Sequence, residues 1–310
     1  MEFETVGAVR STAKFEGIFS SSDGTVIAEY IARMSFYFGK NIVKMDFTIK
    51  NPKAAKHPGG LWDLGDPGSV FFKDLSMQVS LKSTSKTDIM WKTQLNNSFN
   101  SANSNNLIIY QDSSGVENWD SPVHVNKDGL VKNRFRGYRV TSDRIIEEGH
   151  RASPSVAIRS GEKVITAAIQ NFWQNFPKSL EVKNNAIVIR LFPEQYDDMF
   201  ELQGGEQKTH SVYIHFGSGV EEPEHLDWVQ SPLVVRAPSE WYSRSMALGY
   251  ISPFGKDKNP EYQKLVNNAI EGDSNFFLLR EKIDEYGWRH FGDVYANHEI
   301  VSYKGSSLLF

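Results

Sequence analysis

The sequence predicts a mainly β protein, a large antiparallel β-sandwich followed by a short C-terminal helical segment. Segments in which apolar and polar residues alternate follow one another up to about residue 216, as half-buried strands do. Short turns rich in Gly, Asn, Ser and Pro join them, and no strand–helix–strand alternation occurs, so a parallel sheet is not expected. Helical spacing of apolar residues begins only after about residue 239.

Composition excludes several classes of function. The 310 residues carry a net charge of −4 and no cysteine, which excludes disulfides and thiolate chemistry. No basic block suggests nucleic-acid binding, and no apolar run approaches the roughly 18 residues of a membrane span. The start, Met1–Val6, does not have the pattern of a signal peptide, and the compartment stays unknown. The apolar ending Ser306–Phe310 suggests a piece of a longer chain.

The first elements expected are two or three antiparallel strands within residues 7–50. Turn residues at Ser20–Gly24 and Gly39–Asn41 separate them. The segment Ile42–Ile49 alternates Ile, Lys, Asp and Thr with Val, Met, Phe and Ile, which indicates a half-buried strand.

The stretch Asn51–Ser69 is punctuated by glycine and proline and is therefore expected to be a structured loop. A loop that carries His57, Trp62, Asp63 and Asp66 is a candidate cleft rim. The two aspartates could bind a hard cation through oxygen, but capping of the turns at the neighbouring glycines is the more ordinary role.

Further strands are expected at 70–81, 87–95, 107–111, 135–140, 144–148, 155–159, 163–169 and 181–192. Between the last two lies Gln170–Lys178, which is dense in amides and aromatic rings. Amides beside an aromatic ring suit sugar hydroxyls, although core aromatics with capping amides fit nearly as well.

The segment from Gly204 to Phe216 reads as one strand entered through a glycine turn. Alternation places Glu206, Lys208 and His210 on one face with Val212, Ile214 and Phe216. The apolar end of that face belongs to a core. The three ionisable groups at its other end suggest the floor of a polar cleft, and an ion-pair cluster at the sheet edge is the competing interpretation.

The remaining chain is expected to be helical, with Ser239 as an N-cap and a helix opened by Asn259 and Pro260. A further helical segment is expected at 275–286, ending in the aromatic turn Gly287–Asp293. The sequence thus divides into a sandwich at 1–238, a linker at 239–254 and a helical region at 255–310.

Long segments of the sequence resemble the exo-rhamnogalacturonan lyases of polysaccharide lyase family 26 and their bacterial relatives. They are HPGGLWDLGDPGS from His57, FWQNFPK from Phe172, GGEQKTH from Gly204 and REKIDEYGWRHFGD from Arg280. The resemblance implies a sandwich of the supersandwich type, with 255–310 as the incomplete start of an α/α toroid. It also implies a fragment of an enzyme that cleaves rhamnogalacturonan (pectin) by β-elimination, and a chain that is by itself a poor catalyst.

Such an elimination needs a neutralised carboxylate, a base and an acid for the leaving oxygen. On this hypothesis Lys208 and His210 are the catalytic candidates, with Glu206 holding one of them. The predicted substrate-binding residues are His57, Trp62, Trp173, Gln174, Lys178, Arg289 and His290. The partner would be an acidic polysaccharide or oligosaccharide; no cofactor or metal is expected, and His290, Asp293, His298 and Glu299 have no known ligand spacing.

The sequence leaves two alternatives open. One is a non-catalytic carbohydrate-binding sandwich that stacks sugars on Trp62, Trp119 and Trp173. The other is a structural domain with no sugar site. On the hypothesis of a lyase fragment, exposed apolar side chains within residues 255–310 are expected to favour self-association. A glycoside hydrolase is less favoured, because no pair of carboxylates stands out.

Overall fold

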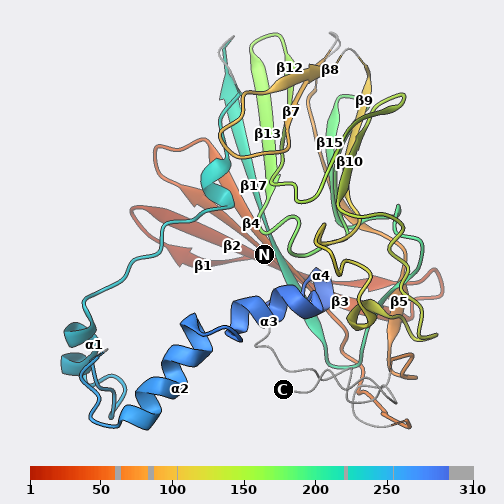
Figure 1. The fold of residues 1–310 in the computed structure, drawn as a ribbon. Helices are drawn as coiled ribbons and strands as arrows, with labels where there is room; N and C mark the ends of the chain where they lie inside the picture. Colours follow the sequence, from red (N-terminus) through yellow and green to blue (C-terminus); the bar gives the residue numbers. More distant parts are fainter. Residues whose placement is uncertain (60–63, 83–86, 103, 220–222, 254, 293–310) are drawn as a thin grey trace.

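The computed structural model describes residues 1–59, 64–82, 87–102, 104–219, 223–253 and 255–292. They form a β-sandwich with helices at the C-terminal end (Figure 1), which confirms the predicted fold class. Each strand pair in the sheets is antiparallel.

The larger sheet has nine strands. In spatial order they are β1 (Glu2–Val6), β2 (Arg10–Ser20), β3 (Val26–Tyr37), β4 (Ile42–Lys50), β17 (Gln207–Ser218), β13 (Lys163–Ile169), β12 (Ser155–Ser160), β7 (Asp88–Lys92) and β8 (Asn100–Ala102). β17, from late in the chain, lies between β4 and β13 with Val212 opposite Met45 and Ile169. It therefore joins the N-terminal strands to the middle of the chain.

The second sheet has six strands, and a small two-stranded sheet flanks it. The six are β11 (Ile145–Gly149), β10 (Tyr138–Thr141), β9 (Asn106–Gln111), β14 (Lys178–Lys183), β15 (Ala186–Phe192) and β6 (Leu75–Ser80); the pair is β16 (Phe200–Leu202) and β5 (Val70–Phe72). The short strands β1, β8 and β16 are additions to the strands expected from the sequence, and the strand expected at 70–81 is divided into β5 and β6.

The core lies between the two large sheets. The nine-stranded sheet contributes Ile89, Val156, Ile158, Ile165, Val212 and Ile214, and the six-stranded sheet contributes Leu107, Ile109, Val140, Leu180, Ile187 and Ile189. Strands β1–β3 fan out to one side of the molecule (Figure 1), where Phe3, Ile18 and Phe36 are exposed. Burying a side chain of Leu or Ile size contributes about 1.5–3 kcal/mol, so the stable centre of the fold is β17–β13–β12–β7 against the second sheet.

The strand β17 follows the predicted alternation, with one correction. His210, Val212 and Ile214 are buried, whereas Phe216 is 44% exposed although it was predicted to be buried. The buried face of the strand therefore ends at Ile214, since its last residues reach the edge of the core. The turn before β17 is closed by Glu206, whose carboxylate accepts from the Gln203 amide at 2.7 Å.

The C-terminal helices leave the sandwich and then return to it. They are α1 (Ser239–Ser245), α2 (Pro260–Glu271), α3 (Phe276–Ile283) and α4 (Gly287–His290), preceded by the 3₁₀ turns η1 (Pro122–His124) and η2 (Asp227–Val229). In Figure 1, α1 and α2 stand apart from the sheets, and α3 leads back to α4. The prediction that α-helix begins at about 239 is confirmed, but the residue at the N-cap is Pro238, and α1 falls in the stretch expected to be a linker.

Candidate functional site at the junction of the sandwich and the C-terminal helices

Residues 281–291 are docked on the sandwich by their own backbone. The Gly287 amide donates to the Gln174 carbonyl at 2.7 Å, and the Trp288 amide donates to the Phe176 carbonyl at 2.9 Å. Gly287 has φ +92°, and a Cβ atom there would lie 3.3 Å from the Phe176 ring. Glycine is required at this position because a side chain would be strained by the backbone and crowded by that ring.

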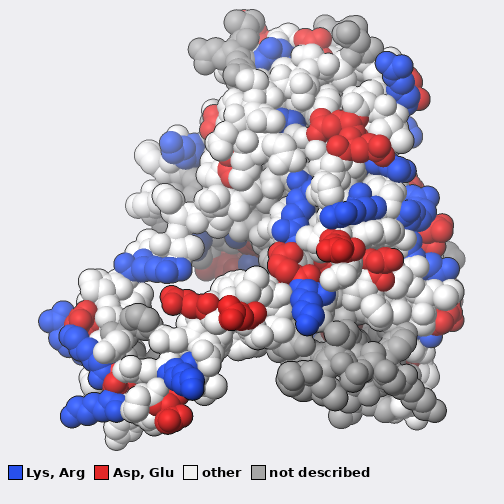
Figure 2. Space-filling view, viewed as in Figure 1, with Lys and Arg blue, Asp and Glu red and all other residues white. Residues whose placement is uncertain are grey.

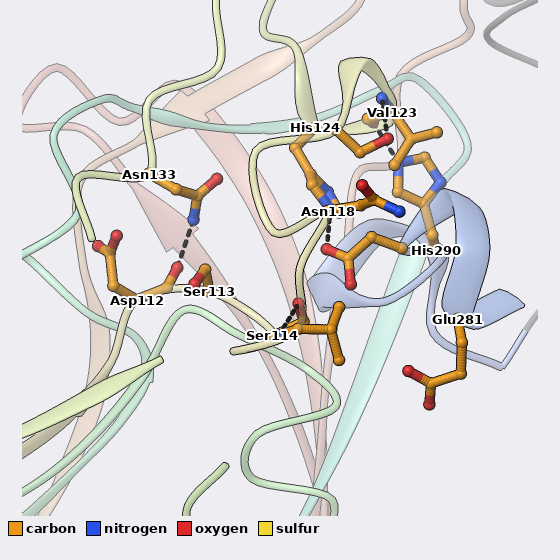
Figure 3. A network of polar contacts seen from close by, with 12 residues as sticks. Asp112, Ser113, Ser114, Asn118, Val123, His124, Asn133, Glu281 and His290 are labelled. Atoms are coloured by element: carbon orange, nitrogen blue, oxygen red, sulfur yellow. Dashed lines mark hydrogen bonds and ion pairs between the residues drawn. The ribbon is translucent and has the colours of Figure 1, made fainter. Parts of the chain in front are cut away.

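A buried hydrogen bond between His124 and Asp284 ties the same segment to η1. His124 Nε2 lies 2.7 Å from Asp284 Oδ2, and the two side chains are 6% and 0% exposed. Figure 3 shows His124 and His290 next to each other, and their ring centroids are 6.2 Å apart. His290 Nε2–H donates to the Val123 carbonyl at 2.8 Å, which fixes the tautomer. Burial lowers the pKa of His290 to about 3, with help from His124 and Arg289, so His290 is neutral at pH 7.

A second cluster brackets Trp173. The Arg151 guanidinium lies 3.9 Å from the centre of the Trp173 ring and bonds Glu281 at 2.8 Å. Tyr286 packs 5.0 Å from Trp173, and its hydroxyl donates to Glu281 Oε1 at 2.6 Å. Arg151 and Tyr286 thus pack against the Trp173 ring, and this contact helps to hold the C-terminal segment on the sandwich.

A cavity of about 190 Å³ opens where α4, η1 and the loop 193–201 meet. We call it the junction cavity. Its aromatic lining is Phe71, Phe176, Tyr196, Tyr286 and Trp288, and its polar lining is His124, Asn126, Lys127, Asn133, Asp198, Glu201, Arg289 and His290. Apolar walls with a few converging polar groups are typical of ligand sites.

The polar groups of the junction cavity are held in place by their neighbours. Asp198 accepts from Asn126 Nδ2 at 2.6 Å and from the Met199 amide at 2.8 Å, and each carboxylate oxygen keeps a further lone pair. Glu201 accepts from the Gly65 amide and the Ser69 hydroxyl, both at 2.7 Å. Asn133 donates to the Asp112 carbonyl (Figure 3). These groups are therefore preorganised for hydrogen bonds to a ligand.

Arg289 contributes a guanidinium group to the lining of the junction cavity. Its guanidinium lies 5.0 Å from the centre of the Trp288 ring and 3.5 Å from the Val125 carbonyl. Its Nε is buried and has no hydrogen-bond partner among the described residues. A bound acceptor at this edge would satisfy a donor that the folded chain leaves unpaired.

Two of the predicted site residues, Lys178 and His210, are buried. Lys178 is fully buried, its Nζ donates to the Leu191 carbonyl at 2.6 Å, and burial, reinforced by Lys208, lowers its pKa far below the usual range. His210 is 4% exposed and packs edge-on against Phe192 at 5.1 Å. Burial, then Lys178 and Lys208, lowers the pKa of His210 far below its usual range.

The structure separates the predicted site residues into two groups. Arg289 and His290 line the junction cavity. Lys178 and His210 are buried, whereas Glu206 and Lys208 are half-buried and Lys208 donates to the Phe291 carbonyl at 3.4 Å. The backbone carbonyl of Gln174 accepts a hydrogen bond from the Gly287 amide. His57 is exposed, and its backbone amide donates to the Asp66 carboxylate. Trp62 lies outside the described residues.

Sequence reasoning did not find His124, Asn126, Tyr196 and Asp198. They come from turns without a recognisable spacing, and only the aromatic turn at Gly287 was noted as unusual. Among the described residues, no group of three or more His, Asp and Glu side chains is arranged to hold a metal ion. No helix of that part of the chain has the length and apolar character to cross a membrane.

Comparison with known proteins gives structural neighbours only. No family model and no curated protein matches the sequence. A TPR-domain protein of Parabacteroides distasonis has a TM-score of 0.40 and 9% identity over 76% of this chain and 36% of its own. A putative aldose 1-epimerase of Escherichia coli has 0.32 and 7%, covering 70% and 68% of the two chains. A galactose mutarotase-like protein of Lactobacillus casei has 0.33 and 13%, covering 69% and 72%.

The family predicted from the sequence is corrected by these findings. Neither family models nor curated proteins support the exo-rhamnogalacturonan lyases, and none of the three solved structures is described as a lyase. The chain also spans only about a third of the length of the TPR-domain protein. With TM-scores of 0.40 and below, the function of this chain has to be argued from its own cavity.

Proposed function

We propose that the protein is a carbohydrate-binding β-sandwich and that the junction cavity is its sugar site. The observation that carries the proposal is the lining of that cavity, where aromatic rings and fixed hydrogen-bonding groups converge from separate elements. The C–H face of a sugar ring is apolar and packs on aromatic rings, while its hydroxyls need both donors and acceptors.

The donors and acceptors of the cavity suit hydroxyl groups. Asn126 and Asn133 provide amides, Asp198 accepts, and Arg289 donates. The charged side chains of the lining are Lys127 and Arg289 against Asp198 and Glu201, which balance. Figure 2 shows the same interspersion of Lys and Arg with Asp and Glu over the face in view. An acidic sugar would pair with Arg289 and a neutral sugar with the amides, so both belong in the test.

Two of the solved structures named above carry descriptions that refer to sugars. The E. coli structure is described as a putative aldose 1-epimerase and the L. casei structure as galactose mutarotase-like. We carry over only sugar binding from those descriptions. Binding needs a cavity of suitable shape with hydrogen-bonding groups, whereas catalysis would also need an assigned acid or base.

Isothermal titration with galactose, rhamnose, galacturonate and their disaccharides tests the proposal. We expect one of these sugars to bind, and Asp198→Ala to weaken it by about tenfold or more because a fixed acceptor is lost. The matched control is Asp197→Ala, an exposed neighbour outside the cavity. Failure of the whole panel to bind, or equal affinity of the Asp198→Ala variant and the wild type, would overturn the assignment.

A further inference from the structure

A second hollow lies on the outer face of the nine-stranded sheet, with a volume of about 690 Å³. We call it the outer groove. The residues that matter are Tyr37, Phe38, Asn41, Tyr213, Glu224 and Trp228. It shares no lining residue with the junction cavity, so it is a separate feature of the fold.

The floor of the outer groove follows from the alternation in β17. Val212 and Ile214 point into the core, so Tyr213 and His215 between and beyond them lie on the opposite face. Tyr213 is packed against a small cluster of Ala168, Leu226 and Val229, which fastens the segment around η2 to the sheet. The floor is therefore a fixed aromatic side chain.

One wall is Trp228, carried by η2. Its ring meets Tyr213 edge-on, with centroids 5.0 Å apart and planes at 83°, and the residue is still 42% exposed. The neighbouring Asp227 forms a 2.6 Å ion pair with Lys92, whose side chain is fully buried. This anchor holds η2 in place, so the exposed part of the Trp228 ring is presented in one orientation.

The opposite wall is the turn between β3 and β4. Phe38 is 87% exposed there, although its backbone is well held. Its amide donates to the Val9 carbonyl at 2.9 Å, and the Phe216 amide donates to the Asn41 carbonyl at 2.8 Å. Gly39 has φ +66°, which glycine adopts without strain. The turn therefore presents the Phe38 ring to solvent from a fixed backbone position beside the groove.

The polar side chains of the outer groove point to an uncharged ligand. Lys40 and Glu224 carry opposite charges, and Asn41 and His215 add groups that donate or accept. Neither sign of charge dominates, so a polyanion gains little here. Aromatic surfaces with mixed donors and acceptors match the apolar faces and the hydroxyls of sugar rings.

We propose that the outer groove binds an uncharged oligosaccharide, with successive sugar rings against Trp228, Tyr213 and Phe38. The proposal does not depend on sugar binding in the junction cavity. It would give the sandwich a contact for a glycan chain on the outside of its large sheet.

Affinity electrophoresis of the full chain in gels that contain barley β-glucan, galactomannan or polygalacturonate tests the proposal. We expect retardation by a neutral polymer and a loss of about tenfold or more in affinity for Trp228→Ala. Phe38→Ala should weaken binding without disturbing the fold, because its side chain is 87% exposed. Trp241→Ala is the control, a tryptophan 54% exposed outside the groove.

The outcomes separate the two sites. Binding that is lost in Trp228→Ala and Phe38→Ala but kept in Asp198→Ala supports the outer groove, whatever happens in the junction cavity. Binding kept in both groove variants, retardation by polygalacturonate alone, or no retardation by either neutral polymer overturns the proposal. Titration with a decaproline peptide adds one more outcome, since saturable binding that Trp228→Ala removes would make the groove a peptide site instead.

Discussion

Lys178 shows how far burial changes a side chain at this site. Its Nζ donates to the Leu191 and Pro177 carbonyls, two uncharged acceptors. Burying an unpaired charge is costly, and the lowered pKa of Lys178 is the consequence. The same environment lowers the pKa of His210, so both basic side chains are held in the buried interior of the fold.

His290 gives a prediction for the dependence of stability on pH. Its pKa in the folded protein is about 3, against roughly 6.5 in an unfolded chain. Between these values the unfolded state binds the proton and the folded state does not, so stability falls as pH falls below about 6.5. This single residue should contribute a slope of about 1.4 kcal/mol per pH unit.

The variant His290→Gln checks this slope, because the Gln amide can still donate to the Val123 carbonyl but does not titrate. Urea unfolding at pH 4.5, 5.5 and 6.5 should show a shallower decline in the free energy of unfolding for the variant than for the wild type. Equal slopes would show that His290 takes up a proton as readily in the folded chain as in the unfolded one.

At the scale of elements, Gly287 is the point on which the docked segment depends. Replacing it with Ala should cost about 1–2 kcal/mol for the left-handed backbone alone, and more because Cβ would crowd Phe176. Gly255→Ala is the matched control: its φ is +75°, and nothing lies within 4 Å of the added Cβ. Thermal unfolding should therefore show a larger loss for Gly287→Ala. An equal loss in both variants would mean that the contact with Phe176 costs nothing.

The elements also show what can be predicted from sequence. Alternation with period two is a local signal, so β2–β4, β12–β15 and β17 were expected at nearly their observed positions. Helix capping is also a local signal, and Asn259 and Asn275 are the N-caps of α2 and α3 in the structure. The junction cavity is different, because its lining comes from residue 71, residues 123–133, 176–177, 196–201 and 286–290. These segments come together where α4 docks on the sandwich, and no local sequence pattern encodes the docking of α4.

The interpretation of β17 as the floor of a cleft stays a prediction, and it shows a limit of the alternation pattern. Three ionisable residues on one face can line a cleft or lie beneath other chain, and alternation alone does not distinguish the two. Trp288 packs on Phe192, which in turn packs on His210, so the C-terminal segment lies over the end of the strand that was expected to be open.

At the scale of the whole molecule, the His124–Asp284 pair joins the sandwich to the C-terminal segment. Removing one partner of a buried hydrogen bond leaves the other polar group unsatisfied, which typically costs about 1–3 kcal/mol and more for a charged group. Asp284→Ala should therefore release residues 281–291 while the sheets, whose core does not include Asp284, remain folded. Since α4 closes the junction cavity, sugar binding there should be lost with it.

Hydrogen exchange can separate this local opening from global unfolding. In Asp284→Ala the amides of Gly287 and Trp288, which bond to Gln174 and Phe176, should exchange much faster than in the wild type. The amides of β12 and β13 should keep their protection, because they pair within the nine-stranded sheet. The double variant His124→Ala/Asp284→Ala should lose less free energy of unfolding than the two single variants lose together, because removing both side chains leaves no buried polar group without its partner. Additive losses would show that the two side chains are not coupled. Uniform acceleration across both sheets would show that the pair supports the sandwich as a whole and not the docked segment alone.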